Sequence, residues 1–204
     1  MQWLTWVRRI QAIAQTGITY ARDPYDRERY EELRHIAAEI IATYADLPVE
    51  QVAGMLALEK GYPTPKVDVR AVVFDAEGRL LLVRETSDGR WALPGGWADQ
   101  GETPSEMAVR EVYEEAGYEV SPTRLLAVYD KDRHQPEARL PAIYKIFIRC
   151  ELAGGAPRTS LETDAVGFFG RHELPPLSAG RTSARQAARM FEYYDQPDLP
   201  ADFD

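Results

Sequence analysis

Three glutamates, Glu111, Glu114 and Glu115, have the spacing of side chains that share one face of a helix. At about 100° per residue they fall within an arc of roughly 100°. Like charges three and four residues apart repel one another and raise one another's pKa values, so a bound cation would relieve the cost. Mg²⁺ prefers oxygen ligands and is commonly held by a few carboxylates together with phosphate oxygens of a substrate. The spacing therefore indicates a candidate site for a hard divalent cation, and a solvated glutamate-rich helix face is the alternative.

The helix that carries these glutamates has start and stop signals on both sides. Thr103 stands at the N-cap position, Pro104 takes the first helical position, and Glu106 completes a capping box. Gly117 stands where a helix ends in a C-cap. An apolar arc beside the acidic one can pack on a sheet, and it comprises Ala108, Val109, Val112 and Ala116. We therefore expect a helix from Thr103 to Ala116 whose acidic face is exposed.

The residues around this helix resemble the signature of the Nudix hydrolase family. Upstream, Leu93-Pro94-Gly95-Gly96 is a glycine-rich turn whose backbone can approach an ion or a phosphate closely. The family pattern asks for glycine, five residues, glutamate, seven residues, then arginine, glutamate, an aliphatic residue, any residue, two glutamates, any residue, glycine and an aliphatic residue. The matching residues are Gly96, Glu102, Arg110, Glu111, Val112, Glu114, Glu115, Gly117 and Tyr118. Tyr118 replaces an aliphatic residue and is the one departure, and so many fixed positions make chance agreement negligible.

The resemblance implies a role for each charged residue of the helix. Glu111, Glu114 and Glu115 are expected to ligate the metal, with the carbonyl of Gly95 as an additional ligand. Arg110 is expected to orient the glutamates, and Arg110 and Glu114 belong to the expected catalytic residues. The expected cofactor is Mg²⁺, for which Mn²⁺ can substitute. The expected reaction is attack by metal-activated water on a phosphorus of a nucleoside diphosphate linked to a group X.

Two roles for acidic side chains stay open. Glu102 either lies beside the metal cluster or stabilises the helix dipole as a first-turn acid. The general base of this family often lies outside the signature on a variable loop. Within the segment 159–164 we choose Glu162 first and Asp164 second, and an ordinary acidic surface loop is the alternative. Glu137 is a third candidate.

The resemblance extends beyond the signature to most of the chain. A helical N-terminal extension and the runs 129–134 and 166–169 look like those of bacterial Nudix enzymes that act on nucleoside diphosphates linked to another group. Similar members are described as pyrophosphatases for ADP-ribose, CDP-choline or related compounds, and they release a nucleoside monophosphate and phospho-X. Cationic donors suit phosphate oxygens. The candidate substrate-binding residues are Arg84, Lys131, Arg133, His134 and Lys145, each of which is alternatively a surface charge.

Turnover and substrate choice are the points that the signature leaves open. One alternative is a catalytically silent Nudix domain that senses a nucleotide metabolite, against which the intact glutamates argue. Another is a house-cleaning nucleoside triphosphate pyrophosphatase. Trp91 either stacks on a base or packs in a sheet core, since an indole suits both environments.

The N-terminal residues 1–62 have helical periodicity with no strand-like run. We expect three helices, the second opened by Asp23-Pro24 and ended at Leu47-Pro48, and the third reaching Glu59. Residues 61–65 read as a linker. About sixty residues make a small core, so this helical domain is expected to bury its apolar face against a second copy of the chain. The expected assembly is a homodimer.

From Lys66 the pattern changes to strands with intervening helices. Val67 to Phe74, the turn from Asp75 to Gly78, and Leu80 to Arg84 together indicate a hairpin. Further strands are expected at 124–129 and 142–150, and a terminal helix at 182–194. Strands around helices indicate an α+β or α/β domain, and the resemblance implies the α+β class, as an α/β/α sandwich with a mixed sheet over residues 66–196. Residues 197–204 read as a loosely held acidic tail.

Composition restricts the partners and the compartment. A net charge of −9 disfavours nucleic acid, because affinity for its phosphates needs an excess of lysine and arginine. Cys150 is the single cysteine, so it forms no internal disulfide and is expected to be a buried, inert thiol. No apolar run approaches the roughly 20 residues that cross a bilayer. We expect a cytoplasmic protein that binds a small nucleotide and neither membrane nor nucleic acid.

Overall fold

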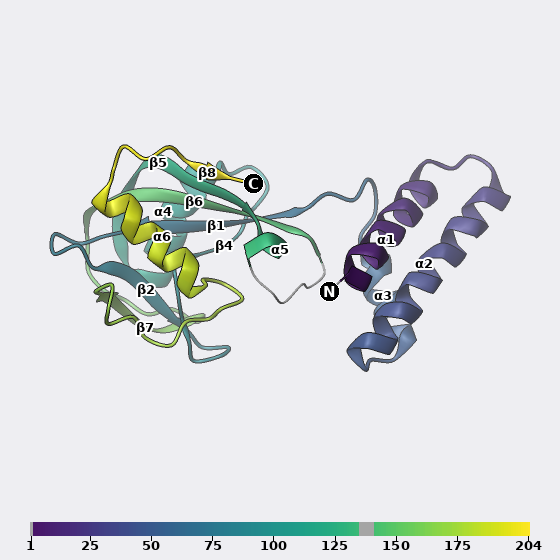
Figure 1. The fold of residues 1–204 in the computed structure, drawn as a ribbon, viewed down its shortest axis with the longest axis horizontal. Coiled ribbons are helices and arrows are strands. Elements are labelled where there is room, and N and C mark those ends of the chain that lie inside the picture. The colour runs from purple at the N-terminus through teal and green to yellow at the C-terminus, as the bar shows by residue number, and fades with distance from the viewer. Residues whose placement is uncertain (1, 135–140) are drawn as a thin grey trace. The chain divides into compact units, whose positions relative to one another are not determined.

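The computed structural model describes residues 2–134 and 141–204. The chain divides into two compact units, Met1–Pro65 and Lys66–Asp204 (Figure 1). No helix within the described residues combines the length and the apolarity that crossing a membrane requires.

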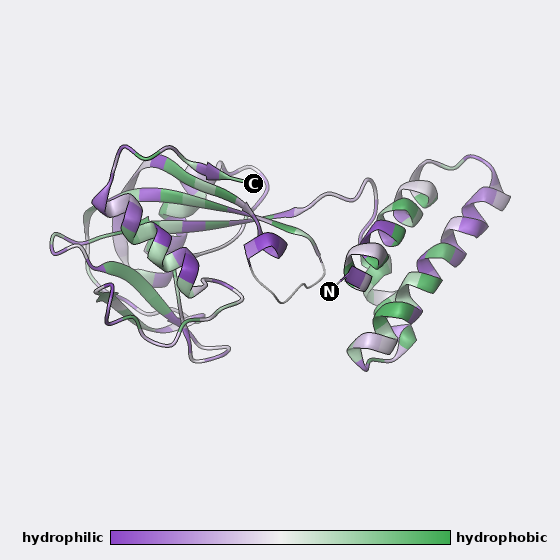
Figure 2. Cartoon of the chain, in the orientation of Figure 1, coloured by the Kyte–Doolittle hydropathy of each residue, from purple (hydrophilic) through white to green (hydrophobic). Residues whose placement is uncertain are grey.

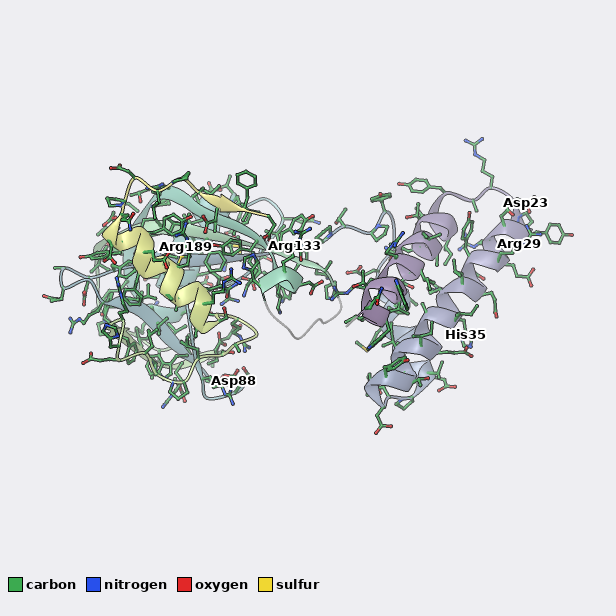
Figure 3. The ribbon with its side chains drawn as sticks, viewed as in Figure 1. Asp23, Arg29, His35, Asp88, Arg133 and Arg189 are labelled. Atoms are coloured by element: carbon green, nitrogen blue, oxygen red, sulfur yellow. The ribbon has the colours of Figure 1, made fainter. Side chains whose placement is uncertain are left out.

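The first unit contains the three predicted helices, α1 (Gln2–Tyr20), α2 (Pro24–Ala45) and α3 (Val49–Leu58). The side chain of Asp23 accepts a hydrogen bond from the amide of Tyr25, and Pro24 occupies the first turn, so α2 begins where its N-cap signal predicts. Asp46 ends α2 in the left-handed conformation, with φ 54°. Figure 3 shows Asp23 at the start of α2, with Arg29 and His35 farther along the same helix.

The second unit combines two sheets with two main helices. Its elements are β1 (Lys66–Val73), β2 (Leu80–Glu85), β3 (Trp91–Ala92), β4 (Gly95–Trp97), α4 (Pro104–Ala116), β5 (Tyr118–Asp130), α5 (Lys131–His134), β6 (Ile143–Gly155), β7 (Thr163–Phe169), α6 (Ala184–Asp195) and β8 (Asp202–Phe203). The larger sheet has the order β4-β1-β6-β5-β8, and the smaller has the order β3-β2-β7. Parallel pairing of β1 with β6 and antiparallel pairing of β1 with β4 make the larger sheet mixed. The predicted α+β fold with a mixed sheet is confirmed.

Alternation along β1 divides the core of this unit into two clusters. Val69, Ala71 and Val73 pack with the apolar face of α4. Val72 and Phe74 point the other way and pack with α6. Both faces of the strand layer are therefore covered by a helix, and Figure 2 shows the apolar colouring of β2, which contributes to both clusters.

The hairpin expected between the first two strands is wrong. The turn itself forms, since the amide of Asp75 donates to the carbonyl of Arg79 at 3.0 Å. Beyond it, β1 and β2 meet at an isolated bridge between Phe74 and Leu80 and then continue in different sheets. The pairing of β1 with β6 involves a segment far along the chain, and local periodicity carries no information about such a partner.

The expectation of a loosely held tail at 197–204 is also wrong. Asp202 and Phe203 form β8, which pairs with β5. The carboxylate of Asp202 accepts two hydrogen bonds from Arg189 of α6, at 2.7 and 2.8 Å, and one from the hydroxyl of Tyr129 at 2.7 Å. Figure 3 labels Arg189 on α6. Acidic composition suggested a solvated segment, but the partners of these acids lie on β5 and α6, which the tail sequence does not contain.

Candidate active site

Helix α4 has the caps that its sequence predicts. The hydroxyl of Thr103 accepts from the amide of Glu106 at 3.2 Å, and the carboxylate of Glu106 accepts from the amide of Thr103 at 2.8 Å. At the other end, Gly117 has φ 77° and its amide donates to the carbonyl of Tyr113. These caps set the register of the helix, and the register decides which carboxylates share a face.

Glu115 is the most buried of the three helix glutamates, with a relative exposure of 5%. Its carboxylate accepts a hydrogen bond from the amide of Gly95 at 2.9 Å, so two predicted metal ligands lie side by side. Burial raises the pKa of Glu115 to about 8, and the charges of Glu111 and Glu85 add to the rise. A buried carboxylate beside other acids is costly when ionised, and a cation at this position would lower that cost.

Arg110 binds the acids on the more exposed side of α4. Its guanidinium lies 3.2 Å from Glu111 and 2.9 Å from Glu114, and Nε donates to both oxygens of Glu102 at 3.0 Å. These contacts support the orienting role predicted for Arg110. They also place Glu102 beside the cluster, and the acid that caps the first turn is Glu106 instead. Burial raises the pKa of Glu111, and the charges of Glu114 and Glu162 act in the same direction.

The glycine-rich turn approaches β1 more closely than any side chain would allow. Gly95 has φ +139°, and a Cβ there would lie 2.0 Å from the backbone oxygen of Val69. Gly96 leaves room for the carboxylate of Glu111, which a Cβ would meet at 3.3 Å. Arg70 on β1 holds the turn from behind by donating to the carbonyl of Leu93 at 3.0 Å. The two glycines therefore bring the backbone against α4 and its acids.

The donor chemistry of this cluster fits a hard divalent cation. Glu111 and Glu115 offer carboxylate oxygens in a partly buried setting, where burial, together with the charges of neighbouring acids, raises their pKa values. Within the described residues, no three acid, imidazole or thiol groups already stand at the spacing of a metal site. Arg110 instead engages Glu111 and Glu114 directly, so the carboxylates must turn from it to share an ion.

Comparison with known families agrees with this geometry. Residues 64–191 match the family described as the NUDIX domain. The chain belongs to the Nudix family. Residues 1–56 match a second family, described as a UDP-X-like, N-terminal oligomerisation domain. The predicted resemblance is confirmed, and the protein is a Nudix hydrolase.

Two relatives of this Nudix hydrolase are similar over its whole length, and a third is similar over about two thirds of it. YjhB of Bacillus subtilis (strain 168), provisionally named an ADP-ribose pyrophosphatase, is 44% identical over 203 residues, covering 100% of this chain and 97% of YjhB. A crystal structure of a UDP-X diphosphatase is 35% identical, with a TM-score of 0.65, covering 100% of this chain and 98% of that one. An ADP-ribose pyrophosphatase from Streptococcus suis 89-1591 is 40% identical, with a TM-score of 0.63, covering 69% of this chain and 100% of that one.

The candidate general bases of the Nudix site have different surroundings in the structure. Glu162 is exposed, and its charge raises the pKa values of both Glu111 and Glu85, so it lies in the vicinity of these two acids. Asp164 instead accepts a hydrogen bond from Arg84 at 2.6 Å. Glu137 lies outside the described residues. Glu162 stays the first choice, and its role as general base stays a prediction.

The predicted substrate-binding residues lie in two places. Arg84 lies near the end of β2 and pairs with Asp164. Lys131, Arg133 and His134 lie on α5, where Figure 3 labels Arg133. The ring of His134 stacks on Tyr129 at 3.9 Å and pairs with Asp204 at 2.9 Å, so His134 also holds the C-terminal residues. Their contact with a substrate stays a prediction.

Trp91 and Cys150 both have structural roles. Trp91 packs edge-on against Phe169 at 4.7 Å beside the α6 cluster, so it belongs to the core. Cys150 is buried, and burial raises the pKa of its thiol to about 12. A thiol with this pKa is not a nucleophile at neutral pH.

The structure adds buried charged residues that the sequence analysis did not select, and it corrects the interpretation of Lys145. Asp68 and Arg70 pair at 2.7 Å on β1, and Glu85 at the end of β2 pairs with Arg181 at 3.0 Å. Lys145 is fully buried, donates to the carbonyl of Arg181 and lies 3.9 Å from Asp68, so it is neither a surface charge nor in reach of a substrate. The sequence signal for the buried pair was the presence of two charged residues, Asp68 and Arg70, at alternate positions of an otherwise apolar strand.

The amine of Lys145 predicts a pH dependence of stability. Burial lowers the pKa of Lys145 to about 7 from an ordinary 10.5, against the opposing charge of Asp68. Between these values the unfolded chain binds a proton that the folded chain does not. The contribution of Lys145 to the free energy of unfolding therefore rises with pH and is lost as pH falls through about 7. Relative to Lys145→Met, the parent should gain up to about 1.4 kcal/mol of unfolding free energy per pH unit from pH 7 to 9.

Urea denaturation of both proteins at several pH values measures this difference. Lys66→Met, at an exposed position of the same sheet, is the control and should follow the parent at every pH. Parallel curves for the parent and Lys145→Met would show that the Lys145 amine does not titrate in this range.

Proposed function

We propose that this Nudix hydrolase cleaves the diphosphate bond of a nucleoside diphosphate linked to a second group, and that it depends on Mg²⁺. ADP-ribose and UDP-linked compounds are the substrates that the names of its full-length relatives support. The observation that carries the proposal is the acid cluster of Glu111 and Glu115, partly buried against the backbone of Gly95. The products are a nucleoside monophosphate and the phosphorylated second group.

In this proposal, the residues of α4 and the glycine turn form the cation site. Glu111, Glu114, Glu115 and the carbonyl of Gly95 supply its oxygen ligands, and Mn²⁺ can replace Mg²⁺. A divalent cation bound there would polarise the phosphoryl oxygens and stabilise the departing phosphate. Arg110 holds Glu111 and Glu114 in place before the cation binds, and the two carboxylates would turn from it to ligate the cation.

Glu162 acts as the general base in this proposal. Its carboxylate takes a proton from the attacking water, the water oxygen forms a bond to phosphorus, and the bridging phosphoanhydride bond breaks. The exposed position of Glu162 on the loop before β7 lets it reach water, while the loop brings its charge towards Glu111. Arg84 lies beside the same loop and can bind a phosphate oxygen there.

A substrate panel with purified protein and Mg²⁺ tests the proposal. The panel contains ADP-ribose, a UDP-sugar, CDP-choline and a nucleoside triphosphate, and chromatography identifies the products. We expect a nucleoside monophosphate from a diphosphate-linked substrate, and no turnover when a chelator removes the cation. Release of pyrophosphate from the triphosphate alone would favour the triphosphate pyrophosphatase. Binding of ADP-ribose without any cleavage would favour the sensor.

We also propose that the first unit makes the protein a homodimer. Trp6, Ile13 and Tyr20 lie seven residues apart on α1 and are all exposed. Seven-residue apolar spacing is the pattern of a helix that packs along another helix. The match to an oligomerisation domain supports the same role for this region. Sedimentation of the full chain, and of a chain lacking residues 1–62, measures the mass, and a truncated form that stays dimeric would contradict the assignment.

A further inference from the structure

Residues 176–182 lie within the connection between β7 and α6, and we call this segment the strap. The amide of Trp91 donates to the carbonyl of Pro176 at 3.0 Å, and the amide of Ser178 donates back to the carbonyl of Trp91 at 2.8 Å. The hydroxyl of Thr182 then accepts from the amide of Leu93 at 3.0 Å. Thr182 has no exposed surface. The strap therefore continues along β3 and ends on the residue that begins the glycine turn.

Arg181 connects the strap to the end of β2. Its guanidinium lies 3.0 Å from the carboxylate of Glu85, 3.4 Å from Asp88, and 3.0 Å from the hydroxyl of Ser87. Figure 3 labels Asp88 in the loop that follows β2. The carbonyl of Arg181 accepts a hydrogen bond from the buried amine of Lys145. Arg181 is thus held from β6 while its side chain holds Glu85 and the loop after it.

Glu85 connects the strap to α4, the helix that carries the candidate metal ligands. Its relative exposure is 6%, so its charge depends on the pairing with Arg181. Glu85 is the β-sheet partner of Thr163, and the hydroxyl of Thr163 donates to the carbonyl of Glu115 at 2.7 Å. The carboxylate of Glu115 in turn accepts from Gly95. One segment therefore contacts both supports of Glu115, which are the turn before Gly95 and the end of β2.

We propose that Arg181 and Thr182 are positioning residues of the metal site, Arg181 acting through Glu85 and Thr182 through Leu93. This inference rests on the proposed function. Neither side chain is expected to touch the substrate. Losing either contact should lower the affinity for the cation and kcat, and should leave KM nearly unchanged. A strap that only stabilises the fold would change the melting temperature without changing cation affinity.

Binding of Mn²⁺ to the full chain without substrate, measured by electron paramagnetic resonance of the free ion, is the decisive readout. We expect Arg181→Gln and Thr182→Val each to weaken Mn²⁺ binding and to lower kcat by about 10 to 100-fold, as loss of a supporting hydrogen bond does at metal sites. Thr182→Ser keeps the hydroxyl and should restore both. Arg171→Gln, at an exposed arginine that pairs with Asp195, is the control and should match the parent.

A double substitution tests the route through Glu85. If Arg181 acts through Glu85, the combined Glu85→Gln and Arg181→Gln protein should bind Mn²⁺ no more weakly than the weaker single variant. Additive losses would contradict this route. Parental Mn²⁺ affinity in both Arg181→Gln and Thr182→Val, with a lowered melting temperature, would overturn the inference. If Arg181→Gln does not fold, the pair Thr182→Val and Thr182→Ser decides it.

A different set of results would contradict the proposed function itself. If the parent binds no Mn²⁺, or if Glu115→Gln binds it as tightly as the parent, the metal site on α4 is wrong and the role of the strap falls with it. If Glu115→Gln loses Mn²⁺ while the strap variants keep it, the site stands and only the positioning role is wrong.

Discussion

Glu115→Gln should lower kcat for the cleaved substrate by at least about 100-fold, because loss of a residue that merely supports a metal ligand already costs about 10 to 100-fold. Glutamine keeps the shape of the side chain and can still accept the hydrogen bond from Gly95. It removes the negative charge that a divalent cation needs. The fold should survive, since a neutral group at this buried position avoids the cost that raises the pKa of Glu115 to about 8.

Steady-state rates in saturating Mg²⁺, together with melting curves in chelator, measure the two halves of this prediction. Glu119→Gln is the matched control, because Glu119 follows the same helix and is exposed outside the signature. It should retain the parental rate. A Glu115→Gln protein with parental kcat would remove Glu115 from the metal site, and a protein that melts far below the parent would show that the negative charge supports the fold.

Gly95→Ala should destabilise the second unit by more than about 3 kcal/mol, since left-handed strain of about 1–3 kcal/mol adds to a steric conflict. The new Cβ would lie 2.0 Å from the backbone oxygen of Val69, and β1 cannot move away without losing its pairing with β6. Activity should fall further than stability predicts, because any displacement of the turn moves the Gly95 amide that donates a hydrogen bond to Glu115.

Gly101→Ala separates the two contributions. Gly101 also has a positive φ, +94°, but a Cβ there would have nothing within 4 Å. It should cost only the strain, about 1–3 kcal/mol. Urea denaturation of both variants gives the comparison, and equal losses at the two positions would show that the close approach of Gly95 to β1 carries no cost of its own.

Local signals predicted α4 and α2 because helix caps act within four residues. Thr103, Pro104 and Glu106 form the capping box that their order indicates, and Asp23 begins α2 in the same way. The shared face of Glu111, Glu114 and Glu115 follows from helix geometry alone. The spacing of the signature then sufficed to identify the family, which the match over residues 64–191 confirms.

The errors arose where distant partners decide the structure. The hairpin failed because β1 pairs in parallel with β6, and the loose tail failed because Asp202 meets Arg189 and Tyr129. Lys145 read as a surface charge or a phosphate contact, yet it is fully buried. In each case the local sequence showed the charge or the apolar run correctly, and a segment far along the chain determined its surroundings.

The sequence by itself therefore determined the chemistry of this protein, because the donors of the candidate metal site lie within one capped helix and the turn before it. Only the tertiary structure decided how that helix is supported. Arg70 on β1, Glu85 on β2 and Arg181 in the strap meet around it from separate parts of the chain. Helix geometry is a short-range property of consecutive residues, whereas burial and ion pairing depend on which strands come together, so the first can be predicted from spacing and the second cannot.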